Sequence, residues 1–564
     1  MSAELLALPP SFVLLAGALL VLALNGRARE IALLAVPLVA LFFVWQVPDG
    51  AAWRVPFLGY DLVPLEGGRL GRLFATVFTV MAFAGNLFAL KRKSRLELFA
   101  ANFYAGGAVG VVLAGDLITL FIYWELMALG STLVIWSAGP ANRSVGLRYL
   151  MIHLLGGVIL MAGIAGEIGA TGSVAFTTMQ PDSLARGLIL AGFLLNAGAP
   201  PISAWLPDAY PETSFSGMVY LSAFTTKTAV FVLLRGFPGA EVLIPIGLFM
   251  AFYGIVFAIL ENDMRRILAY SIVNQVGFMV TGAGLGSEMA INGAAAHAFT
   301  HIIYKALLLM SAGSVLFMTG KRKCTDLGGL FQSMPLTCIC GIVGALSISA
   351  FPLTSGFVSK SMISQAAADE HLMIVWLALA AGSAGVFLHA GIKFPWFVFF
   401  QKDSGLRPPD PPMNMRVAMI LFSVLCIGLG VLPGPLYAIL PYPVDFVPYT
   451  GAHVVGQLQL LLFSGLAFFL LLRWLQRTET ITLDTDWFYR RLGKLLGQRA
   501  VEQTTKSRDG VALLVTRQVE RFLQGLYRHH GPKGILARTW PTGSMAIWTA
   551  VLLTAYYLLY LLGV

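Results

Sequence analysis

The chain has 564 residues, of which 57% are hydrophobic and only 12% are charged, and its formal net charge is +10. A soluble globular domain carries roughly 25% charged residues, so this composition excludes a soluble protein and predicts an integral membrane protein. The basic residues gather in short loops and in one late segment, which favours phospholipid headgroups over nucleic acid as their partners.

Apolar runs of about 18 residues or more predict an all-α membrane protein with about sixteen spanning helices. Basic clusters such as Arg27/Arg29 and Lys91 to Arg95 follow the odd-numbered helices. The positive-inside rule then places these loops in the cytoplasm and the N-terminus outside, in a bacterial inner membrane. The acidic connection LPDAYPETS after the seventh helix breaks this pattern.

Two predicted helices contain internal prolines: the seventh, NAGAPPISAWLPDAY, and the twelfth, ALSISAFPLTSGFVSKSM. Proline removes a backbone donor, and membranes tolerate the freed carbonyls only where the backbone lines protein or a polar cavity. The breaks are five helices apart, and an odd separation means that the two helices cross in opposite directions. This arrangement predicts two inverted five-helix repeats. The expected divisions are 1–95, 96–236 and 237–402 for the N-terminal helices and the two repeats, then 403–480, 481–542 and 543–564.

The segment 481–542 is expected to lie along the cytoplasmic membrane surface, before a last membrane helix. Leu514/Val515, Val519, Phe522/Leu523 and Leu526 repeat at helical spacing, with arginines between them, as in an amphipathic helix. Three glycines, at 493, 497 and 510, interrupt this pattern. Whether this helix holds a neighbouring subunit or only lies on lipid stays open.

The stretch HAFTHIIYKALLLMSAG places His297, His301 and Lys305 four residues apart inside an apolar helix. Steps of four keep all three side chains in one stripe about 80° wide. An ionisable residue at membrane depth costs about 2.5–3.5 kcal/mol on insertion scales, so this stripe must face the bundle interior. Each of the three residues is a candidate proton carrier.

Other ionisable residues lie near the middle of predicted helices. Glu125 in FIYWELMALGS needs a nearby cation to stay ionised, and Lys227 in LSAFTTKTAVFVLL is its expected partner. Lys360 follows the break in the twelfth helix and is expected to share one hydrated path with Lys305. Lys393 lies nearer a helix end, where snorkelling to the interface is the expected role.

The predicted tenth helix contributes uncharged polar side chains, namely Tyr270, Ser271, Asn274 and Gln275. They could line a water file or form interhelical hydrogen bonds worth about 1 kcal/mol each. We expect His153 on the sixth helix to be a satisfied core histidine and Arg148 to anchor a loop end.

A row of buried lysines, histidines and a glutamate has a physical use in proton transport. Burial lowers the pKa of a lysine and a nearby carboxylate raises it, so moving the carboxylate switches the lysine between binding and releasing a proton. The chain has no nucleotide loop, catalytic triad or haem motif. Its four cysteines lie beside apolar runs with no histidine nearby, so no metal, cofactor, redox site or hydrolytic site is expected.

Six motifs show a family resemblance, namely WELMALGS, PPISAWLPDAY, TTKTAV, ENDMRRILAYSIVNQVGFM, HAFTHIIYKALLLMSAG and FPLTSGFVSK. From about residue 70 to 440 the chain resembles the antiporter-like membrane subunits of Mrp-type cation/proton antiporters, complex I and membrane-bound hydrogenases, and most of all the Mrp D type. The resemblance implies a central proton path through Glu125, Lys227, His297, His301, Lys305 and Lys360. It also implies other membrane subunits as partners and protons as cargo, with Na⁺ as a second candidate ion.

One position departs from that family pattern. Where such subunits carry a lysine before the break in the seventh helix, this chain has Asn196. Asparagine binds water through hydrogen bonds but holds no proton at neutral pH. Either Lys227 takes over the relay in this half, or the protein conducts poorly and serves a partner that conducts.

Three functions remain open from the sequence. The leading one is an ion-translocating subunit that works as a translocase only within a multisubunit antiporter or redox-driven pump. The second is the membrane subunit of a proton-coupled inorganic-carbon uptake system with a soluble zinc protein as partner. The third is a non-conducting scaffold subunit.

Overall fold

The computed structural model describes residues 8–475, 477–479 and 483–563, and every structural statement below concerns these residues. The chain divides into two compact units, Met1–Asp486 and Trp487–Val564. Each unit is described by itself.

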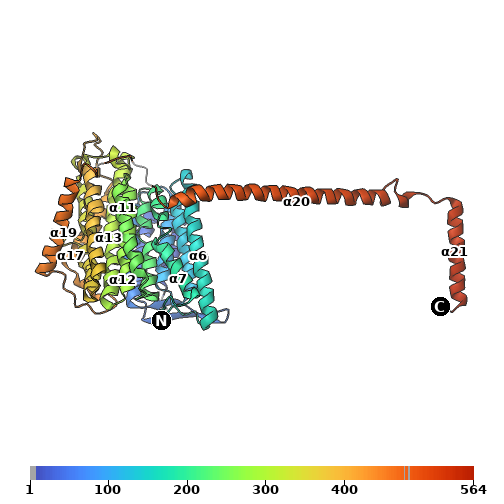
Figure 1. The fold of residues 1–564 in the computed structure, drawn as a ribbon, viewed down its shortest axis with the longest axis horizontal. Coiled ribbons are helices and arrows are strands. Elements are labelled where there is room, and N and C mark those ends of the chain that lie inside the picture. Colours follow the sequence, from blue (N-terminus) through green and yellow to red (C-terminus); the bar gives the residue numbers. More distant parts are fainter. Residues whose placement is uncertain (1–7, 476, 480–482, 564) are drawn as a thin grey trace. The chain divides into compact units, whose positions relative to one another are not determined.

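The first unit is a bundle of helices that run side by side (Figure 1). Its helices are α1 Pro10–Ala23, α2 Gly26–Val44, α3 Arg69–Phe88, α4 Arg95–Val112, α5 Leu117–Trp136, α6 Arg143–Thr171, α7 Leu184–Ala197, α8 Trp205–Ala209, α9 Gly217–Leu221, α10 Thr225–Gly236, α11 Leu243–Leu260, α12 Met264–Leu285, α13 Glu288–Thr319, α14 Pro335–Ile348, α15 Ser355–Asp369, α16 Met373–Val386, α17 Met413–Val431, α18 Gly434–Ala438 and α19 Gly451–Leu470.

Eleven helices in the described ranges are long and apolar enough to cross a membrane, and three shorter apolar helices, α1, α7 and α14, accompany them. The prediction of a multi-pass, mostly helical membrane protein is therefore confirmed. The count of sixteen spans and the inverted relation of the two repeats remain predictions.

The bundle core is formed by α10, α12 and α13, which pack against one another. Small residues let helices approach closely there. A Cβ atom on Gly277 of α12 would lie 2.5 Å from the carbonyl oxygen of Gly247 on α11, so only glycine fits this contact. Close backbone approach fixes the faces that α11 and α12 turn toward each other.

The helix breaks are visible in the chain path. α7 ends at Ala197, where Gly198 has a φ of 80°, and α8 begins at Trp205. α14 ends at Ile348 and α15 begins at Ser355. A third interruption, between α9 and α10, was not expected from the sequence, because no proline or glycine lies within it.

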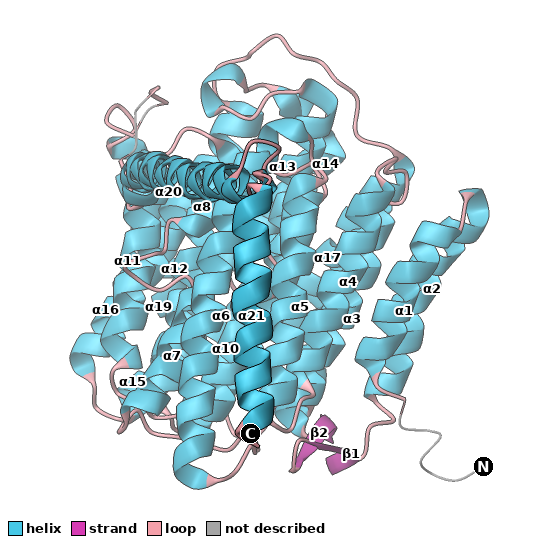
Figure 2. Cartoon of the chain, turned by 90° about the vertical axis from the view of Figure 1, so that its right-hand side faces the viewer, coloured by secondary structure: helices cyan, strands magenta, loops and turns pink. Residues whose placement is uncertain are grey.

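The expectation of an all-helical chain is wrong between residues 50 and 67. There, strands β1 Gly50–Phe57 and β2 Tyr60–Gly67 pair as an antiparallel hairpin, with Phe57 opposite Tyr60. Leu58 and Gly59 have φ angles of 49° and 83°, which suits a tight two-residue turn. The hairpin lies at one end of the bundle (Figure 2), where Asp116 accepts a hydrogen bond of 2.7 Å from the Val63 N–H group.

The second unit contains a π-helical turn, Phe488–Leu492, then α20 Gly493–His530 and α21 Thr542–Leu561. α20 is continuous over 38 residues, or about 57 Å at 1.5 Å per residue. Gly497 and Gly510, which interrupt the sequence pattern, do not break this helix, and Gly493 is its first residue. One glycine costs a helix only about 0.5–1 kcal/mol. Residues 481 and 482 of the predicted segment lie outside the described residues.

Candidate functional site

The structure buries the α13 stripe in the centre of the bundle. His297, His301 and Lys305 are fully buried, each with 0% exposure. α13 packs against α12, α14, α15 and α17, so these side chains meet protein and not lipid. This is the environment that the four-residue spacing predicted.

Lys305 is held by the neighbouring helix α12. Its Nζ atom donates a 2.8 Å hydrogen bond to Ser271 Oγ and a longer one, 3.5 Å, to the Leu268 carbonyl. A neutral hydroxyl holds an ammonium ion without neutralising its charge. Lys305 is therefore positioned by neutral oxygen atoms of α12.

One turn further along α12, Gln275 connects to the histidines. Its Oε1 atom lies 3.2 Å from His297 Nε2 and accepts a 3.0 Å hydrogen bond from Tyr304 Oη. Gln275 also donates to Asn274, which in turn donates to the Ala251 carbonyl of α11 at 2.7 Å. Ser271, Asn274 and Gln275 thus form interhelical hydrogen bonds beside the ionisable stripe.

His301 lies between His297 and Tyr304, with ring centroids 6.2 and 5.2 Å away. Neither ring nitrogen has a hydrogen-bond partner among the described residues. An unsatisfied buried polar group costs about 1–3 kcal/mol, so a stable chain retains such a group only with water or a functional need.

Lys227 and Lys360, like Lys305, are held by neutral oxygen atoms, but in other parts of the bundle. Lys227 Nζ donates to the Ser222 carbonyl at 2.7 Å, at the interruption between α9 and α10. Lys360 Nζ donates to the Ile348 carbonyl at 2.9 Å, at the break between α14 and α15. Helix C-termini carry unpaired carbonyls and a partial negative charge, so each break creates a site for a cation.

Lys360 also connects to the histidine stripe. Its ammonium lies 5.0 Å from the centre of the Phe278 ring, and the preceding residue, Ser359, lies 3.3 Å from His297 Nδ1. Contacts therefore lead from Lys305 through α12 and His297 to Lys360. No ion pair within the described ranges includes Lys227, Lys305 or Lys360.

Glu125 and Lys227, which were expected within reach of each other directly or through one water, form no direct ion pair among the described residues. Glu125 is half-buried on α5, and its Oε1 atom has no hydrogen-bond partner in the described part of the chain. Instead, this oxygen lies against α6, where a Cβ atom on Gly157 would overlap it. Lys227 donates its hydrogen bonds to the Ser222 carbonyl and to Thr226 Oγ1, which are neutral oxygens, and not to this carboxylate.

Asn196 is the last-but-one residue of α7 and is buried. Its Oδ1 atom lies 2.8 Å from Nδ1 of His153 on α6. The expectation that His153 is a satisfied core histidine is therefore only half met, because its Nε2 atom has no partner among the described atoms. The sequence offered one signal for His153, which is that it lies one turn before the Gly156–Gly157 pair on the same helix.

Two residues have roles other than those expected. Tyr270 turns away from the stripe and donates a 2.7 Å hydrogen bond to Asp484. Lys393 is only 5% exposed and does not snorkel. Its Nζ atom donates to the carbonyls at the C-terminus of α11, at 3.2 Å to Ala258 and 2.6 Å to Glu261, with a further bond to Ile259.

A charged network at one end of the bundle was missed from the sequence. Arg148, expected only to anchor a loop, forms a two-bond ion pair with Asp208 at 2.9 and 3.0 Å. Arg322 pairs with Glu212 at 3.0 Å and with Asp263 at 2.8 Å. The acidic LPDAYPETS loop, which departs from the charge pattern of other loops, supplies Asp208 and Glu212 and was the available signal.

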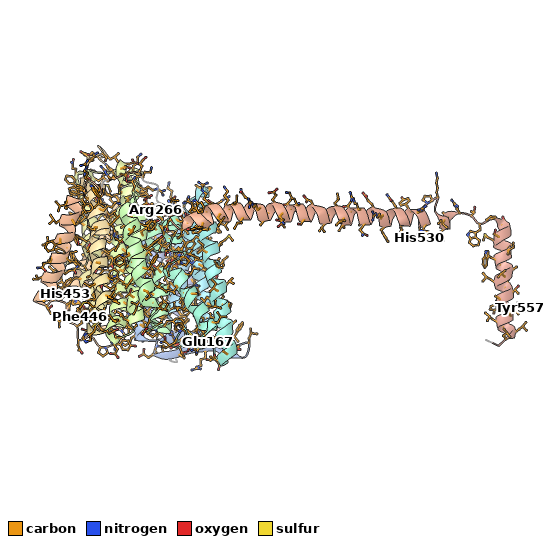
Figure 3. The ribbon with its side chains drawn as sticks, viewed as in Figure 1. Glu167, Arg266, Phe446, His453, His530 and Tyr557 are labelled. Carbon is orange, nitrogen blue, oxygen red and sulfur yellow. The ribbon has the colours of Figure 1, made fainter. Side chains whose placement is uncertain are left out.

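The same network surrounds a buried arginine. Arg265 donates to the carbonyls of Pro211, Thr213 and Ser214, with distances of 2.7–2.8 Å. Burial lowers the pKa of Arg322 and the carboxylates of Asp263 and Glu212 raise it, with a net upward shift. Figure 3 shows Arg266, next to Arg265 in the chain, at the end of the bundle opposite Glu167.

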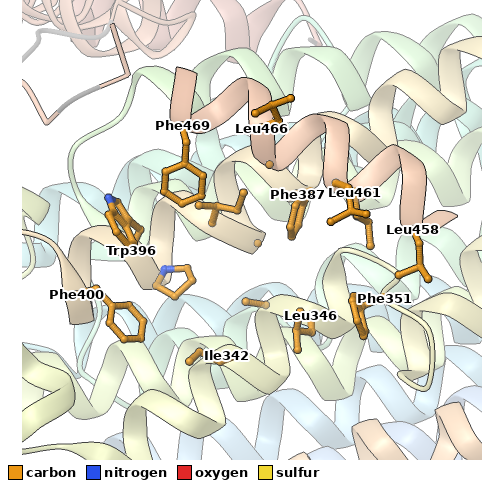
Figure 4. Close-up of a pocket in the computed structure, with 16 residues that line it drawn as sticks. Ile342, Leu346, Phe351, Phe387, Trp396, Phe400, Leu458, Leu461, Leu466 and Phe469 are labelled. Carbon is orange, nitrogen blue, oxygen red and sulfur yellow. The ribbon is translucent and has the colours of Figure 1, made fainter. Parts of the chain in front are cut away.

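One cavity in the described part of the chain lies apart from these polar groups. It has a volume of about 450 Å³ and lies between α14, the π-helical residues 387–400 and α19. Its lining is apolar, with Leu346, Phe387, Leu461 and Phe469 among its walls (Figure 4). No cluster of three metal-ligating side chains occurs in the described ranges.

The fold and the site define a class: a multi-pass membrane protein with a row of buried lysines and histidines, two of the lysines at helix breaks. Comparison with known proteins agrees with this class. Residues 114–387 match the family described as "NADH:quinone oxidoreductase/Mrp antiporter, TM". Over these residues, somewhat under half of the chain, the protein is similar to that family.

Two relatives and one solved structure illustrate the likeness. The A/B component of a probable K(+)/H(+) antiporter of Rhizobium meliloti is 30% identical over 67% of this chain, which spans only 41% of that relative's length. The D component of the Na(+)/H(+) antiporter of Alkalihalophilus pseudofirmus is 28% identical over 68% of this chain and 83% of its own. A protein of the Mrp complex from Dietzia sp. DQ12-45-1b has the same fold, with a TM-score of 0.78, 23% identity, and coverage of 93% of this chain and 63% of that one.

Proposed function

We propose that this chain moves protons across the membrane as one subunit of a multisubunit cation/proton antiporter or a related redox-driven complex. The protons pass between Lys227, the α13 stripe and Lys360. Names of the relatives supply Na⁺ and K⁺ as candidate counter-ions.

One observation carries this proposal: Lys227, Lys305 and Lys360 are each at most 2% exposed and bind only neutral oxygen atoms. A structural lysine in a membrane is usually paired or snorkels to the interface. Three buried ammonium groups without carboxylates are costly, and their positive charge is easily lost to a neighbouring base. Such groups suit a proton relay better than a scaffold.

The partners follow from the same reasoning. The related proteins are named as components of antiporters, and the solved structure is that of a complex. We expect other membrane subunits and phospholipids around this chain, and a cytoplasmic position for the charged network near Arg322.

The proposal is tested in everted membrane vesicles that contain the native complex, by recording the pH change after addition of NaCl or KCl. Lys360→Ala should stop the pH change while the complex still assembles, because Pro352 and the loop around it, and not the lysine, set the helix break. Lys321→Ala, an exposed loop lysine, is the matched control and should behave like the parent. A parental response of Lys360→Ala would overturn the proposal.

A further inference from the structure

The first half of the bundle contains a titratable side chain beside the position that lacks a lysine. His153 on α6 and Asn196 on α7 are each 1% exposed, and they share a 2.8 Å hydrogen bond. The amide oxygen of Asn196 accepts, so His153 Nδ1 carries the hydrogen. In the neutral ring, Nε2 is then the basic nitrogen with a free lone pair.

The His153 ring is held in place on its faces and edges. Tyr149 and Trp205 lie 4.1 and 4.7 Å from it, measured between ring centroids. These neighbours are themselves fixed, since Tyr149 Oη donates to Ser131 Oγ at 3.0 Å and Trp205 Nε1 donates to the Leu195 carbonyl at 3.1 Å. The surrounding contacts orient the ring without using Nε2.

Buried polar atoms without partners among the described residues gather around this turn of α6. They are His153 Nε2, Asn196 Nδ2 and Glu125 Oε1. Residues 153 and 157 share one face of α6, and Glu125 Oε1 touches that helix where Gly157 lacks a side chain. On the other side, α7 packs against α10, which carries Lys227. Helix contacts therefore lead from α5, which carries Glu125, through α6 and α7 to α10, which carries Lys227.

We propose that His153 carries the proton that Asn196 cannot hold, and so connects Glu125 with Lys227 in this half of the bundle. This inference rests on the proposed function. Protonated Glu125 gives its proton, through water, to His153 Nε2, which leaves a carboxylate and an imidazolium whose Nδ1–H stays bonded to Asn196. The Nε2–H bond then breaks toward neutral Lys227, which becomes an ammonium while the ring returns to its neutral form.

The test uses the native complex in proteoliposomes, with proton flux recorded by an enclosed pH dye. His153→Gln keeps hydrogen-bonding capacity but holds no proton, and should lower the flux about 100-fold or more, as expected for loss of an acid–base group. The double variant His153→Gln/Asn196→Lys restores a proton carrier at this place and should recover most of the flux. His371→Gln, in an exposed loop, is the control and should match the parent.

Two results would overturn the inference: parental flux in His153→Gln, or low flux that Asn196→Lys does not rescue, which would mark the histidine as a packing residue. His153→Asn replaces His153→Gln if the latter does not assemble. Lys360→Ala separates this inference from the proposed function. If Lys360→Ala is slow and His153→Gln is parental, only the histidine relay fails; if both are parental, the proposed function fails.

Discussion

At the scale of single residues, buried cations are held by oxygen atoms that the backbone leaves unpaired. Lys227, Lys360 and Lys393 each donate to carbonyls at a helix break or helix end. A carbonyl dipole stabilises an ammonium ion but does not lock the proton as a carboxylate would. Lys393 lies at a helix end, whereas Lys227 and Lys360 lie at breaks in the middle of a helix.

The contact between Glu125 and α6 gives a prediction at Gly157. Adding one methyl group there brings a carbon atom into overlap with Glu125 Oε1, so Gly157→Ala must displace the carboxylate. A shift of this size can cost up to about 100-fold in a proton-transfer step. Flux in proteoliposomes should fall, whereas Gly169→Ala on the same helix, with open space around it, should not change it. Equal flux in the two variants would show that the position of Glu125 is unimportant.

Lys393 is predicted to act on stability more than on transport. Lys393→Met leaves several α11 carbonyls without a donor in a buried place, which should lower the free energy of unfolding by about 1–3 kcal/mol. Thermal unfolding of the purified protein in detergent measures this loss. The exposed Lys402→Met serves as the control. An unchanged midpoint for Lys393→Met would mean that water replaces the ammonium without cost.

At the scale of elements, the interrupted helices position Lys227 and Lys360, whereas the continuous helix α13 carries the histidines and Lys305. The sequence predicted the two proline-marked breaks, because proline cannot donate a backbone hydrogen bond. It did not predict the interruption between α9 and α10, since Ser222, Ala223 and Phe224 have no backbone restriction of their own. That interruption depends on tertiary contacts, such as the hydrogen bond from the Thr225 N–H group to Tyr104 Oη at 2.8 Å.

In the candidate site, too, some features follow from the local sequence pattern and others depend on tertiary packing. The burial of the α13 stripe was predicted correctly, because ionisable side chains are too costly to face lipid. The spacing did not show that α13 is buried on all its faces from Ala290 to Val315. The role of Tyr270 and the neighbours of Glu125 could not be read from spacing. They depend on which residues far along the chain, Asp484 and Gly157, are brought against them.

α20 allows a test of whether the long helix holds partner subunits. Gly510 lies inside this 38-residue helix, and Gly510→Pro should break it at a cost of about 3 kcal/mol. If α20 binds neighbouring subunits, the variant complex should lose subunits on a native gel, while Gly510→Ala should keep them. A complete complex with Gly510→Pro would instead favour a helix that lies only on lipid.

At the scale of the whole molecule, the buried groups form a connected set from α12 to α15 with few compensating carboxylates. Carboxylates gather toward the ends of the bundle, where they pair with arginines such as Arg148 and Arg322 at one end and Arg186 at the other. Neutralised charges toward the ends and uncompensated cations in the centre suit the proposed proton path through the middle of the bundle.

The central claim is that the buried cations release protons and do not merely provide positive charge. Lys305→Arg tests this claim most directly, because arginine keeps the charge but does not give up its proton in proteins. Proton flux through the reconstituted native complex should be as low in Lys305→Arg as in Lys305→Ala, with both variants assembled. Parental flux in Lys305→Arg would contradict the account, since charge alone would then be sufficient at the centre of the path.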